Sequence, residues 1–251
     1  MAILERLRLP GWVRPAFRRA GFELVRLTPA SHSGSRTLAM LGSVGVDLVL
    51  DVGANTGQYA RRLRETGYRG RIVSFEPLAG AFETLRKESA EDALWEAERI
   101  ALGAAPGKAQ IHIAANSWSS SLLEMLPRHL ESAPGSAYIG SEEVSVQTLG
   151  WALKTWQRGA AHTFVKLDVQ GSERAVLEGA GVALDELAGL QIELSLVPLY
   201  QGEMLFLEMI SLLTAKGFVL MDLEAGHRDP ATGQLLQMDG IFLRPVGRGA
   251  G

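Results

Sequence analysis

The sequence of 251 residues contains no cysteine. This absence excludes disulfide scaffolds, thiolate metal ligands and cysteine nucleophiles, and it is compatible with a reducing compartment. An excess of positive charge is missing too, because 25 lysine and arginine residues face 28 aspartate and glutamate residues, for a formal charge of -3. A protein that coats nucleic acid needs a broad positive surface, so we expect no nucleic-acid partner.

Long apolar runs are also missing. A spanning helix needs roughly 18 uninterrupted apolar residues, whereas Asp47 and Asp51 interrupt the apolar stretch 44–52. A secretory signal is not evident, since arginine and proline recur where its apolar core should be. These observations predict a cytoplasmic protein without a membrane span. With 47% hydrophobic residues, the chain is expected to bury the core of one full-sized domain.

The first 27 residues are basic and amphipathic, with six arginines against Glu5 and Glu23. Such a segment either contacts an anionic membrane surface or packs on the domain as a short helix with its arginines in solvent. Pro10 and Pro15 interrupt any long helix. Residues 28–35 are predicted to be a linker or loop. Residues 1–43 are therefore treated as an N-terminal helical segment with a linker, and peripheral contact with the inner membrane surface stays open.

From residue 44 on, short apolar runs alternate with stretches of helical spacing. The predicted strands span residues 47–52, 71–75, 97–102, 163–167, 190–194, 218–222 and 241–244. The predicted helices span residues 58–66, 79–88, 172–179 and 204–216. This alternation is typical of an open, largely parallel α/β sheet with helices on both faces. Only a turn-rich loop separates the last two strands, so they are expected to pair as an antiparallel hairpin.

One main domain is predicted over residues 44–246, followed by a frayed tail at 247–251. Residues 104–162 are too many for a simple connection and are treated as an insertion that covers the substrate. The aromatic residues of the insertion either stack on a sugar or pack within it: Trp118, Tyr138, Trp151 and Trp156. A homo-oligomer is compatible with this organisation.

The junction between the first strand and helix reads Asp51-Val-Gly53-Ala-Asn55-Thr-Gly57. Glycines let the backbone approach a ligand, and the helix N-terminus adds free amide donors. The spacing differs from Gly-x-Gly-x-x-Gly and lacks the Lys-Ser/Thr pair of a P-loop, which disfavours NAD and nucleoside triphosphates. The alternative is an ordinary turn with Asp51 capping the helix.

Glu76 closes the second strand. A carboxylate there suits the two hydroxyls of a ribose, and acid near the first turn suits a cationic amino-acid tail. S-adenosylmethionine has both groups and no phosphate, so it is the predicted cofactor.

Asp168 ends the fourth strand, where open α/β sheets place their ligands, and it shares a strand face with Lys166. With Glu173 these residues form either a structural ion pair that caps the next helix or a site in which Asp168 binds the cofactor, close to its transferred methyl and to the incoming hydroxyl. Three residues are candidates for the base that removes the hydroxyl proton: Asp168, Glu193 and His227. For His227 the alternative is an exposed loop residue. The other histidines are expected to be surface or packing residues.

Several motifs together resemble the FkbM family of S-adenosylmethionine-dependent methyltransferases. They are Asp51-Val-Gly-Ala-Asn-Thr-Gly57, Ser74-Phe-Glu-Pro77, Ser119-Ser-Ser-Leu122, Lys166-Leu-Asp-Val-Gln-Gly-Ser-Glu173 and Glu193-Leu-Ser-Leu-Val-Pro-Leu-Tyr200. The resemblance implies the Rossmann-like class I methyltransferase fold, a mostly parallel seven-stranded sheet with a reversed last strand.

The same resemblance implies roles for individual residues. Asp51, Gly53, Asn55 and Gly57 would line the methionine end of the cofactor, Glu76 would bind its ribose, and Tyr59 would face the site. Adenine would lie beside Ala101, near the loop that contains Ser119, although no carboxylate or amide stands at that predicted strand end. Gly150 replaces an acid that is usual before its helix, which is expected at most to loosen the helix start.

The leading hypothesis is O-methyl transfer to a hydroxyl of a sugar, glycan, glycolipid or other small natural product. No required metal is expected, because Val169 and Gln170 follow Asp168 where clustered oxygen ligands would be needed. Two alternatives stay open. A nicotinamide-dependent oxidoreductase lacks its glycine spacing and any Tyr-x-x-x-Lys pair, and a non-catalytic nucleoside-binding module would bind ligand without turnover.

Overall fold

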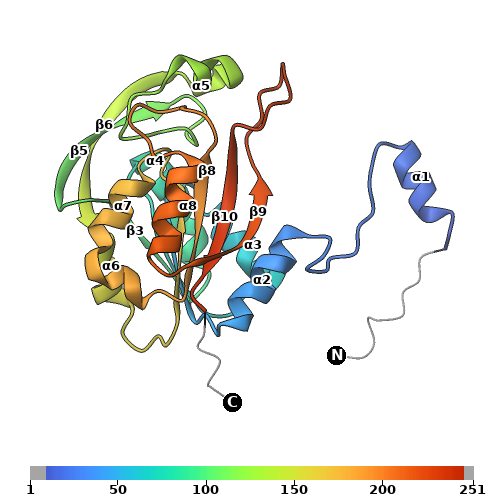
Figure 1. The fold of residues 1–251 in the computed structure, drawn as a ribbon, viewed down its shortest axis with the longest axis horizontal. Helices are drawn as coiled ribbons and strands as arrows, with labels where there is room; N and C mark the ends of the chain where they lie inside the picture. Colours follow the sequence, from blue (N-terminus) through green and yellow to red (C-terminus); the bar gives the residue numbers. More distant parts are fainter. Residues whose placement is uncertain (1–9, 246–251) are drawn as a thin grey trace.

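The centre of the molecule is a seven-stranded sheet, seen in a computed structural model that describes residues 10–245 (Figure 1). Its order is β3-β2-β1-β7-β8-β10-β9. The strands are β1 (Leu48–Val52), β2 (Arg71–Phe75), β3 (Trp95–Glu98), β7 (Thr163–Leu167), β8 (Gly189–Ser195), β9 (Val219–Ala225) and β10 (Gln237–Leu243). Neighbours from β3 to β8 are parallel, whereas β10 is antiparallel to β8 and β9. The expected reversed last strand and terminal hairpin are thus confirmed.

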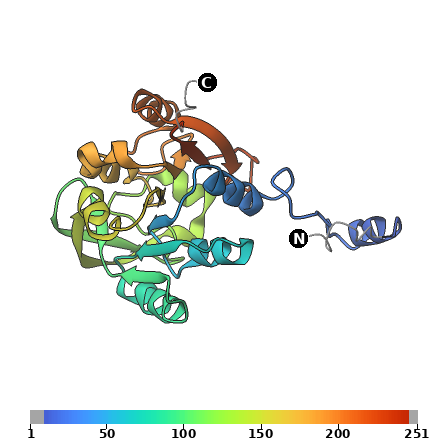
Figure 2. The ribbon, with the colours of Figure 1, turned by 90° about the horizontal axis from the view of Figure 1, so that it is seen from below.

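Both faces of the sheet are covered, which explains why β1 and β7 read as continuous apolar runs and are buried throughout. Helices α2 (Ser33–Ser43), α3 (Gln58–Thr66) and α4 (Ala79–Ser89) pack on one face around Val49, Ile72 and Phe164. The other face carries α6 (Leu149–Trp156), α7 (Glu173–Ala180) and α8 (Phe206–Ala215). Figure 2 shows these layers from a second direction.

A smaller sheet of order β4-β6-β5 lies beside the first. It contains β4 (Ala101–Gly103), β5 (Gly107–Ala114) and β6 (Tyr138–Thr148), and the short helix α5 (Pro127–Ser132) connects β5 to β6. The predicted single strand at 97–102 is therefore wrong. The chain divides at Arg99, whose guanidinium donates to Glu142 at 2.6 Å, so that β3 ends at Glu98 and β4 pairs with β6.

Gly150 does not weaken the start of α6, because the Thr148 hydroxyl caps it by accepting from the Trp151 amide at 3.1 Å. A Cβ at Gly150 would lie 3.2 Å from the carbonyl oxygens of Gly179 and Ala180. The missing side chain instead permits the close approach of α6 and α7.

The N-terminal part of the described chain extends away from the body (Figure 1). Its helix α1 (Val13–Arg19) has no buried residue. The predicted linker ends earlier than expected, because α2 begins at Ser33, with the His32 ring accepting from the Ser35 amide. No helix within residues 10–245 has the length and apolar character needed to cross a bilayer. The predicted tail at 247–251 lies outside the described residues.

The strand registers bring chemically important residues to one edge of the sheet. Val52 pairs with Phe75 and with Leu167, and Leu167 pairs with Ile192. The residue that follows each of these, in turn Gly53, Glu76, Asp168 and Glu193, must therefore lie in one row at the carboxyl-end side of the sheet, where β1, β2 and β7 have ended and β8 continues for two more residues. That row is where open α/β sheets bind ligands.

We expect Gly179→Ala to lower the free energy of unfolding by about 1–3 kcal/mol, because the added Cβ would overlap rigid backbone. It would lie 2.1 Å from the carbonyl oxygen of Gly103, where α7 meets β4. Gly42→Ala in α2 is the matched control, since nothing lies within 4 Å of its added Cβ. It should be neutral or stabilising. Urea unfolding followed by circular dichroism measures both, and equal stability of the two variants would contradict this packing.

Candidate active site

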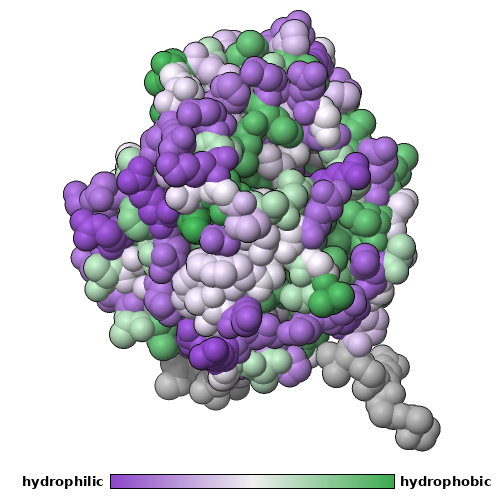
Figure 3. Space-filling model, turned by 90° about the vertical axis from the view of Figure 1, so that its left-hand side faces the viewer, coloured by the Kyte–Doolittle hydropathy of each residue, from purple (hydrophilic) through white to green (hydrophobic). Residues whose placement is uncertain are grey.

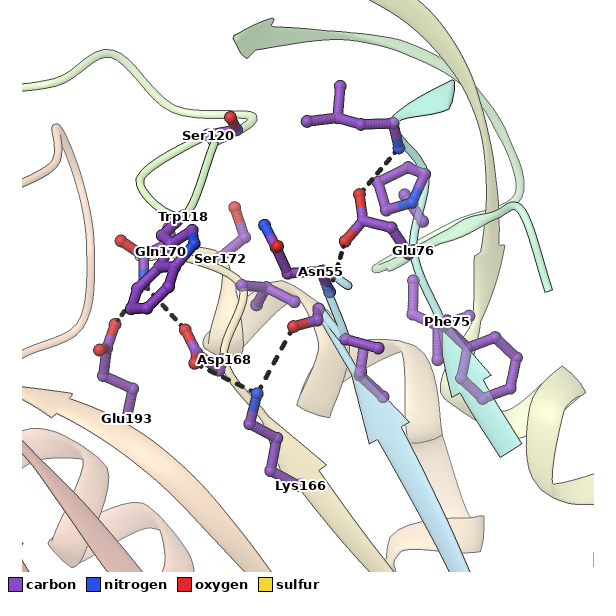
Figure 4. Close-up of a pocket in the computed structure, with 18 of the residues that line it drawn as sticks. Asn55, Phe75, Glu76, Trp118, Ser120, Lys166, Asp168, Gln170, Ser172 and Glu193 are labelled. Carbon is purple, nitrogen blue, oxygen red and sulfur yellow. Dashed lines mark hydrogen bonds and ion pairs between the residues drawn. The ribbon is translucent and has the colours of Figure 1, made fainter. Parts of the chain in front are cut away.

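A cavity of about 390 Å³ opens at the carboxyl ends of the parallel strands. Gly53, Glu76, Asp168 and Glu193 all line it, as the strand registers require. The insertion contributes residues 117–118 and 120–122, and β10 contributes Asp239. Figure 4 shows Glu76 on one side of the cavity, with Asp168 and Glu193 across from it.

Gly53 has a left-handed backbone, with φ of 75°, and cannot be replaced without a collision. A Cβ there would lie 1.8 Å from the carbonyl oxygen of Asp168. The glycine thus allows the turns after β1 and β7 to meet. Gly57 is also left-handed, but its added Cβ would meet the Trp95 ring at 2.9 Å, and Gly57 does not line the cavity. Its observed role is to begin α3 against the core.

Three non-glycine residues within 10–245 have a positive φ, namely Asn55 (48°), Ser117 (57°) and Gln170 (53°). All three line the cavity. Backbone strain of this kind costs energy and is concentrated at functional sites. The clustering of these three residues therefore makes the cavity a candidate functional site independently of any motif.

Glu76 is buried and holds the turn after β1 in place. One of its carboxyl oxygens accepts from the Asn55 amide at 2.8 Å, and the other accepts from the Leu78 amide at 2.9 Å. Burial raises the pKa of Glu76 to about 7, although both backbone hydrogen bonds act in the opposite direction. Each oxygen keeps a lone pair for a ligand hydroxyl.

Asp51 is fully buried and lies behind the cavity, not in its lining. It accepts from the Ser74 hydroxyl at 3.2 Å and lies 3.7 Å from the Lys166 ammonium. Lys166 also contacts Asp168, at 3.1 Å. Burial acts to lower the pKa of Lys166, but the carboxylates of Asp168 and Asp51 outweigh it and raise that pKa. Asp51 thus anchors the lysine that positions Asp168.

Asp168 forms the ion pair with Lys166 that was expected from sequence, and it also lines the cavity. Glu173 is a structural residue of the following turn. One of its oxygens accepts from the amides of Val169 and Gly171 at 3.0 and 3.2 Å. The helix start is therefore held by Glu173, which leaves Asp168 free to face the cavity.

Glu193 lies beside Asp168 and accepts from two side-chain amides, Gln170 at 2.9 Å and Gln237 at 2.8 Å. Burial, and then the nearby Asp168 carboxylate, raise the pKa of Glu193 well above its ordinary value. Tyr59 lines the cavity as expected, and its hydroxyl donates to Gln191 at 3.1 Å. Its ring lies 5.6 Å from the Lys166 ammonium.

Asp239 was not identified from sequence. It lies opposite Glu193 in the antiparallel pairing of β10 with β8 and lines the same cavity. Burial first, and Asp168 second, raise its pKa to about 6. The sequence contained one indication of this residue, a polar side chain that interrupts the apolar run before residue 241. The pairing that brings Asp239 to Glu193 joins two strands that are distant in the sequence, so local sequence does not predict it.

Two predicted site residues lie away from the cavity lining. His227 hydrogen-bonds the Ser132 hydroxyl at 2.9 Å and stacks on His129, because its loop folds over α5. Ser119 is buried, and its hydroxyl meets Asn116 and Ser136. The structure thus does not bring His227 to the acids as a base.

Ala101 does line the cavity, as part of β4. The carboxylate at the end of the third strand is that of Glu98, which lies outside the lining.

The last strand, β10, runs antiparallel to its two neighbours, β8 and β9. This sheet order, together with a cavity after β1, β2 and β7, defines a class I methyltransferase fold. The model of the methyltransferase FkbM domain matches residues 51–220. The chain belongs to this family of methyltransferases, whose cofactor is S-adenosylmethionine.

Solved structures with a related fold are distant in sequence. The magnesium protoporphyrin IX methyltransferase of Synechocystis PCC 6803, solved with bound S-adenosylmethionine, is 11% identical with a TM-score of 0.44, over 85% of this chain and 78% of that one. An S-adenosylmethionine-dependent methyltransferase of Mesorhizobium loti is 11% identical with a TM-score of 0.43, over 86% and 100%. Nothing among the curated proteins matches the chain.

The cavity fits the cofactor on chemical grounds. It offers a buried carboxylate with free lone pairs at Glu76, a glycine turn open to a ligand at Gly53, and apolar walls at Ala101, Leu102 and Ile111. No group of three or more histidines, aspartates and glutamates within the described chain has a geometry that holds a metal ion.

Proposed function

We propose that the protein is an S-adenosylmethionine-dependent O-methyltransferase whose acceptor is a hydroxyl of a sugar, glycan, glycolipid or other small natural product. The observation that carries this proposal is the pair of carboxylates, Asp168 and Glu193, held side by side in the cavity across from Glu76 (Figure 4). Such a pair can orient a hydroxyl and accept its proton.

In this proposal the two sides of the cavity have separate tasks. Glu76 accepts hydrogen bonds from the ribose, and the turn at Gly53 and Asn55 faces the amino-acid end of the cofactor. Bound S-adenosylmethionine supplies a methyl group on a sulfonium, which is already a good leaving group. The protein therefore has to align the hydroxyl, exclude water and remove one proton. Asp168 or Glu193 is the base, and His227 is not.

The lining of the acceptor side favours hydroxyls over anions. It holds three carboxylates and two glutamines. Of the two cations in the cavity lining, Lys166 is already paired with Asp51 and Asp168, and Arg62 lies beside Tyr59, so that carboxylates outnumber unpaired cations. An acceptor with a phosphate near its reacting atom would meet repulsion there. This supports a small hydroxylated acceptor and argues against nucleic acid.

Of the four aromatic residues considered from sequence, Trp118 lines the cavity and is 68% exposed. Trp151 and Trp156 pack edge to face, and Tyr138 stacks on His112. Trp118 is thus the residue placed to stack on a sugar face. A cytoplasmic location and a homo-oligomer stay predictions.

We expect the affinity for S-adenosylhomocysteine to rise about tenfold from pH 6 to pH 8. Ribose hydroxyls donate to the ionised form of Glu76, and burial raises the pKa of that carboxyl to about 7, so it ionises across this range. Cofactor binding must then release a proton, and affinity must increase as pH rises. Isothermal titration calorimetry measures both quantities.

Glu76→Gln should weaken this binding and remove its pH dependence. Glu98→Gln is the matched control, because Glu98 ends the neighbouring strand outside the cavity lining. It should keep the wild-type profile. The same titration with NADH should show no binding. A pH-independent wild type, or Glu76→Gln indistinguishable from it, would remove Glu76 from the cofactor site.

Asp168→Asn should lower turnover by about 10² to 10⁴ and leave cofactor affinity nearly unchanged, because the amide cannot accept the hydroxyl proton. Turnover is followed as S-adenosylhomocysteine release with a panel of rhamnosides, other deoxy sugars and polyketide alcohols. Asp185→Asn, on the surface near the end of α7, is the control. Equal turnover of Asp168→Asn and wild type would leave Asp168 as a structural ion pair.

A further inference from the structure

The N-terminal arm, defined as residues 10–31, carries large apolar side chains that pack on nothing in the described chain. Trp12 is 71% exposed, Phe22 66% and Leu27 67%, with Phe17 and Val25 exposed as well. The arm projects from the body in two perpendicular views (Figures 1 and 2). On the opposite face of the body, hydrophobic residues form only small patches among hydrophilic ones (Figure 3). Apolar exposure of this kind marks an interaction surface.

The apolar residues of α1 gather on one side of the helix, and two of its three arginines lie on the other side, whereas Arg19 lies at the edge of the apolar side. Trp12, Val13, Ala16 and Phe17 follow the spacing i, i+1, i+4, i+5, which places them on one side of a helix. Arg14 and Arg18 are four residues apart on the other side. A short helix of this pattern has the character of one that lies in a membrane interface.

The charge of the arm is opposite to that of the whole chain. The arm has four arginines and one glutamate, for a formal charge of +3, while the chain as a whole carries -3. Three of these arginines, Arg14, Arg18 and Arg26, line one hollow of the arm together with Glu23, Thr28 and Ser31, and Arg18 forms an ion pair with Glu23 at 2.7 Å, which leaves Arg14 and Arg26 for an anion. Guanidinium groups gathered beside hydroxyls are suited to phosphate oxygens.

We propose that this arm binds an anionic phospholipid surface, with its apolar side chains in the interface and its arginines on the headgroup phosphates. A membrane fits better than a folded partner, because a bilayer requires no complementary groove for seven helical residues. The proposal is independent of methyl transfer, since it concerns binding alone.

The test is flotation of the full-length protein with vesicles of phosphatidylcholine, with or without phosphatidylglycerol, at low and high salt. The wild type should float with the anionic vesicles only, and less at high salt. Arg14→Glu with Arg19→Glu, and separately Phe17→Ser with Phe22→Ser, should reduce the bound fraction at least about tenfold.

The matched controls make equivalent substitutions on the body of the protein instead of on the arm. Lys87→Glu with Lys154→Glu makes the same charge change at exposed positions, and Val182→Ser with Leu207→Ser makes the same loss of exposed apolar surface. Both should float like the wild type. Absence of flotation with anionic vesicles, or equal flotation of the arm variants, would overturn the proposal. Dimers that depend on the arm in vesicle-free gel filtration would do so too, by showing a second copy as its occupant.

A separate observation concerns the acids of the cavity. The Gln170 side-chain amide donates to Asp168 at 2.8 Å and to Glu193 at 2.9 Å, and thus joins the two carboxylates. Its carbonyl oxygen accepts from the hydroxyl of Tyr200 at 2.7 Å. Since two carboxylates can only accept, the nitrogen of the amide must face them, and the Tyr200 hydroxyl stabilises that orientation.

The support of Gln170 is rigid. Tyr200 is fully buried, and its ring packs edge to face on His129. Gly171 is left-handed, with φ of 93°, and its added Cβ would lie 2.9 Å from Tyr200. The Ser121 hydroxyl donates to the backbone carbonyl of Gln170. The strained backbone of Gln170 is thus held from three sides.

We infer that Tyr200 is a positioning residue, which acts through Gln170 on the two carboxylates of the cavity. The inference rests on the proposed function, because its readout is turnover. Tyr200→Phe should lower kcat about tenfold with little change in KM. The acid limb of the kcat–pH profile should move to higher pH, because a less well fixed amide stabilises the charged carboxylates less.

Tyr138→Phe is the matched control, since the Tyr138 hydroxyl donates to the Leu123 carbonyl in the insertion. It should keep the wild-type profile. A Tyr200→Phe protein with a lower melting temperature but an unmoved acid limb would overturn the inference, because Tyr200 would then be purely structural. Absence of turnover in the wild type would count against the proposed function and would be seen before any variant is made.

Discussion

The contact of Lys166 with Asp51 and Asp168 connects the core of the protein to its cavity. Asp51 is fully buried on β1, and Lys166 lies on the adjacent strand β7 in direct register with it. A buried charge is tolerated only when it is paired, so the lysine and the aspartate require one another. The third partner, Asp168, faces the cavity. The same cation that neutralises the interior therefore orients an acid at the surface of the site.

Around this contact the cavity is divided by chemistry. Glu76 and the strained turn at Asn55 form one side, and the acids joined by Gln170 form the other (Figure 4). Burial raises the pKa values of Glu76, Glu193 and Asp239, so the cavity combines acids of unequal strength within a small volume. Such inequality is what acid–base chemistry near neutral pH requires.

Much of the fold was predictable because its information is local. Apolar runs such as 163–167 and the helical spacing after Gly57 specify strands and helices, and residues such as Glu76, Asp168 and Glu193 are recognisable as acids that follow buried strands. Features that depend on distant pairing were missed. The smaller sheet contains a partly exposed strand, β5, and Asp239 reaches the cavity only through its register with Glu193. His227 lies outside the cavity lining because its loop packs on α5, and residue type does not report the direction of a loop.

The order of the strands has a consequence for biosynthesis. β10 follows all the other strands of the described residues 10–245 in the sequence, yet it lies inside the sheet, between β8 and β9, and brings Asp239 to the cavity wall. A nascent chain that ends before Gln237 lacks the Asp239 side of the cavity. It also lacks the strand with which both β8 and β9 pair. The cavity is therefore complete only after β10 has been synthesised and has paired with β8.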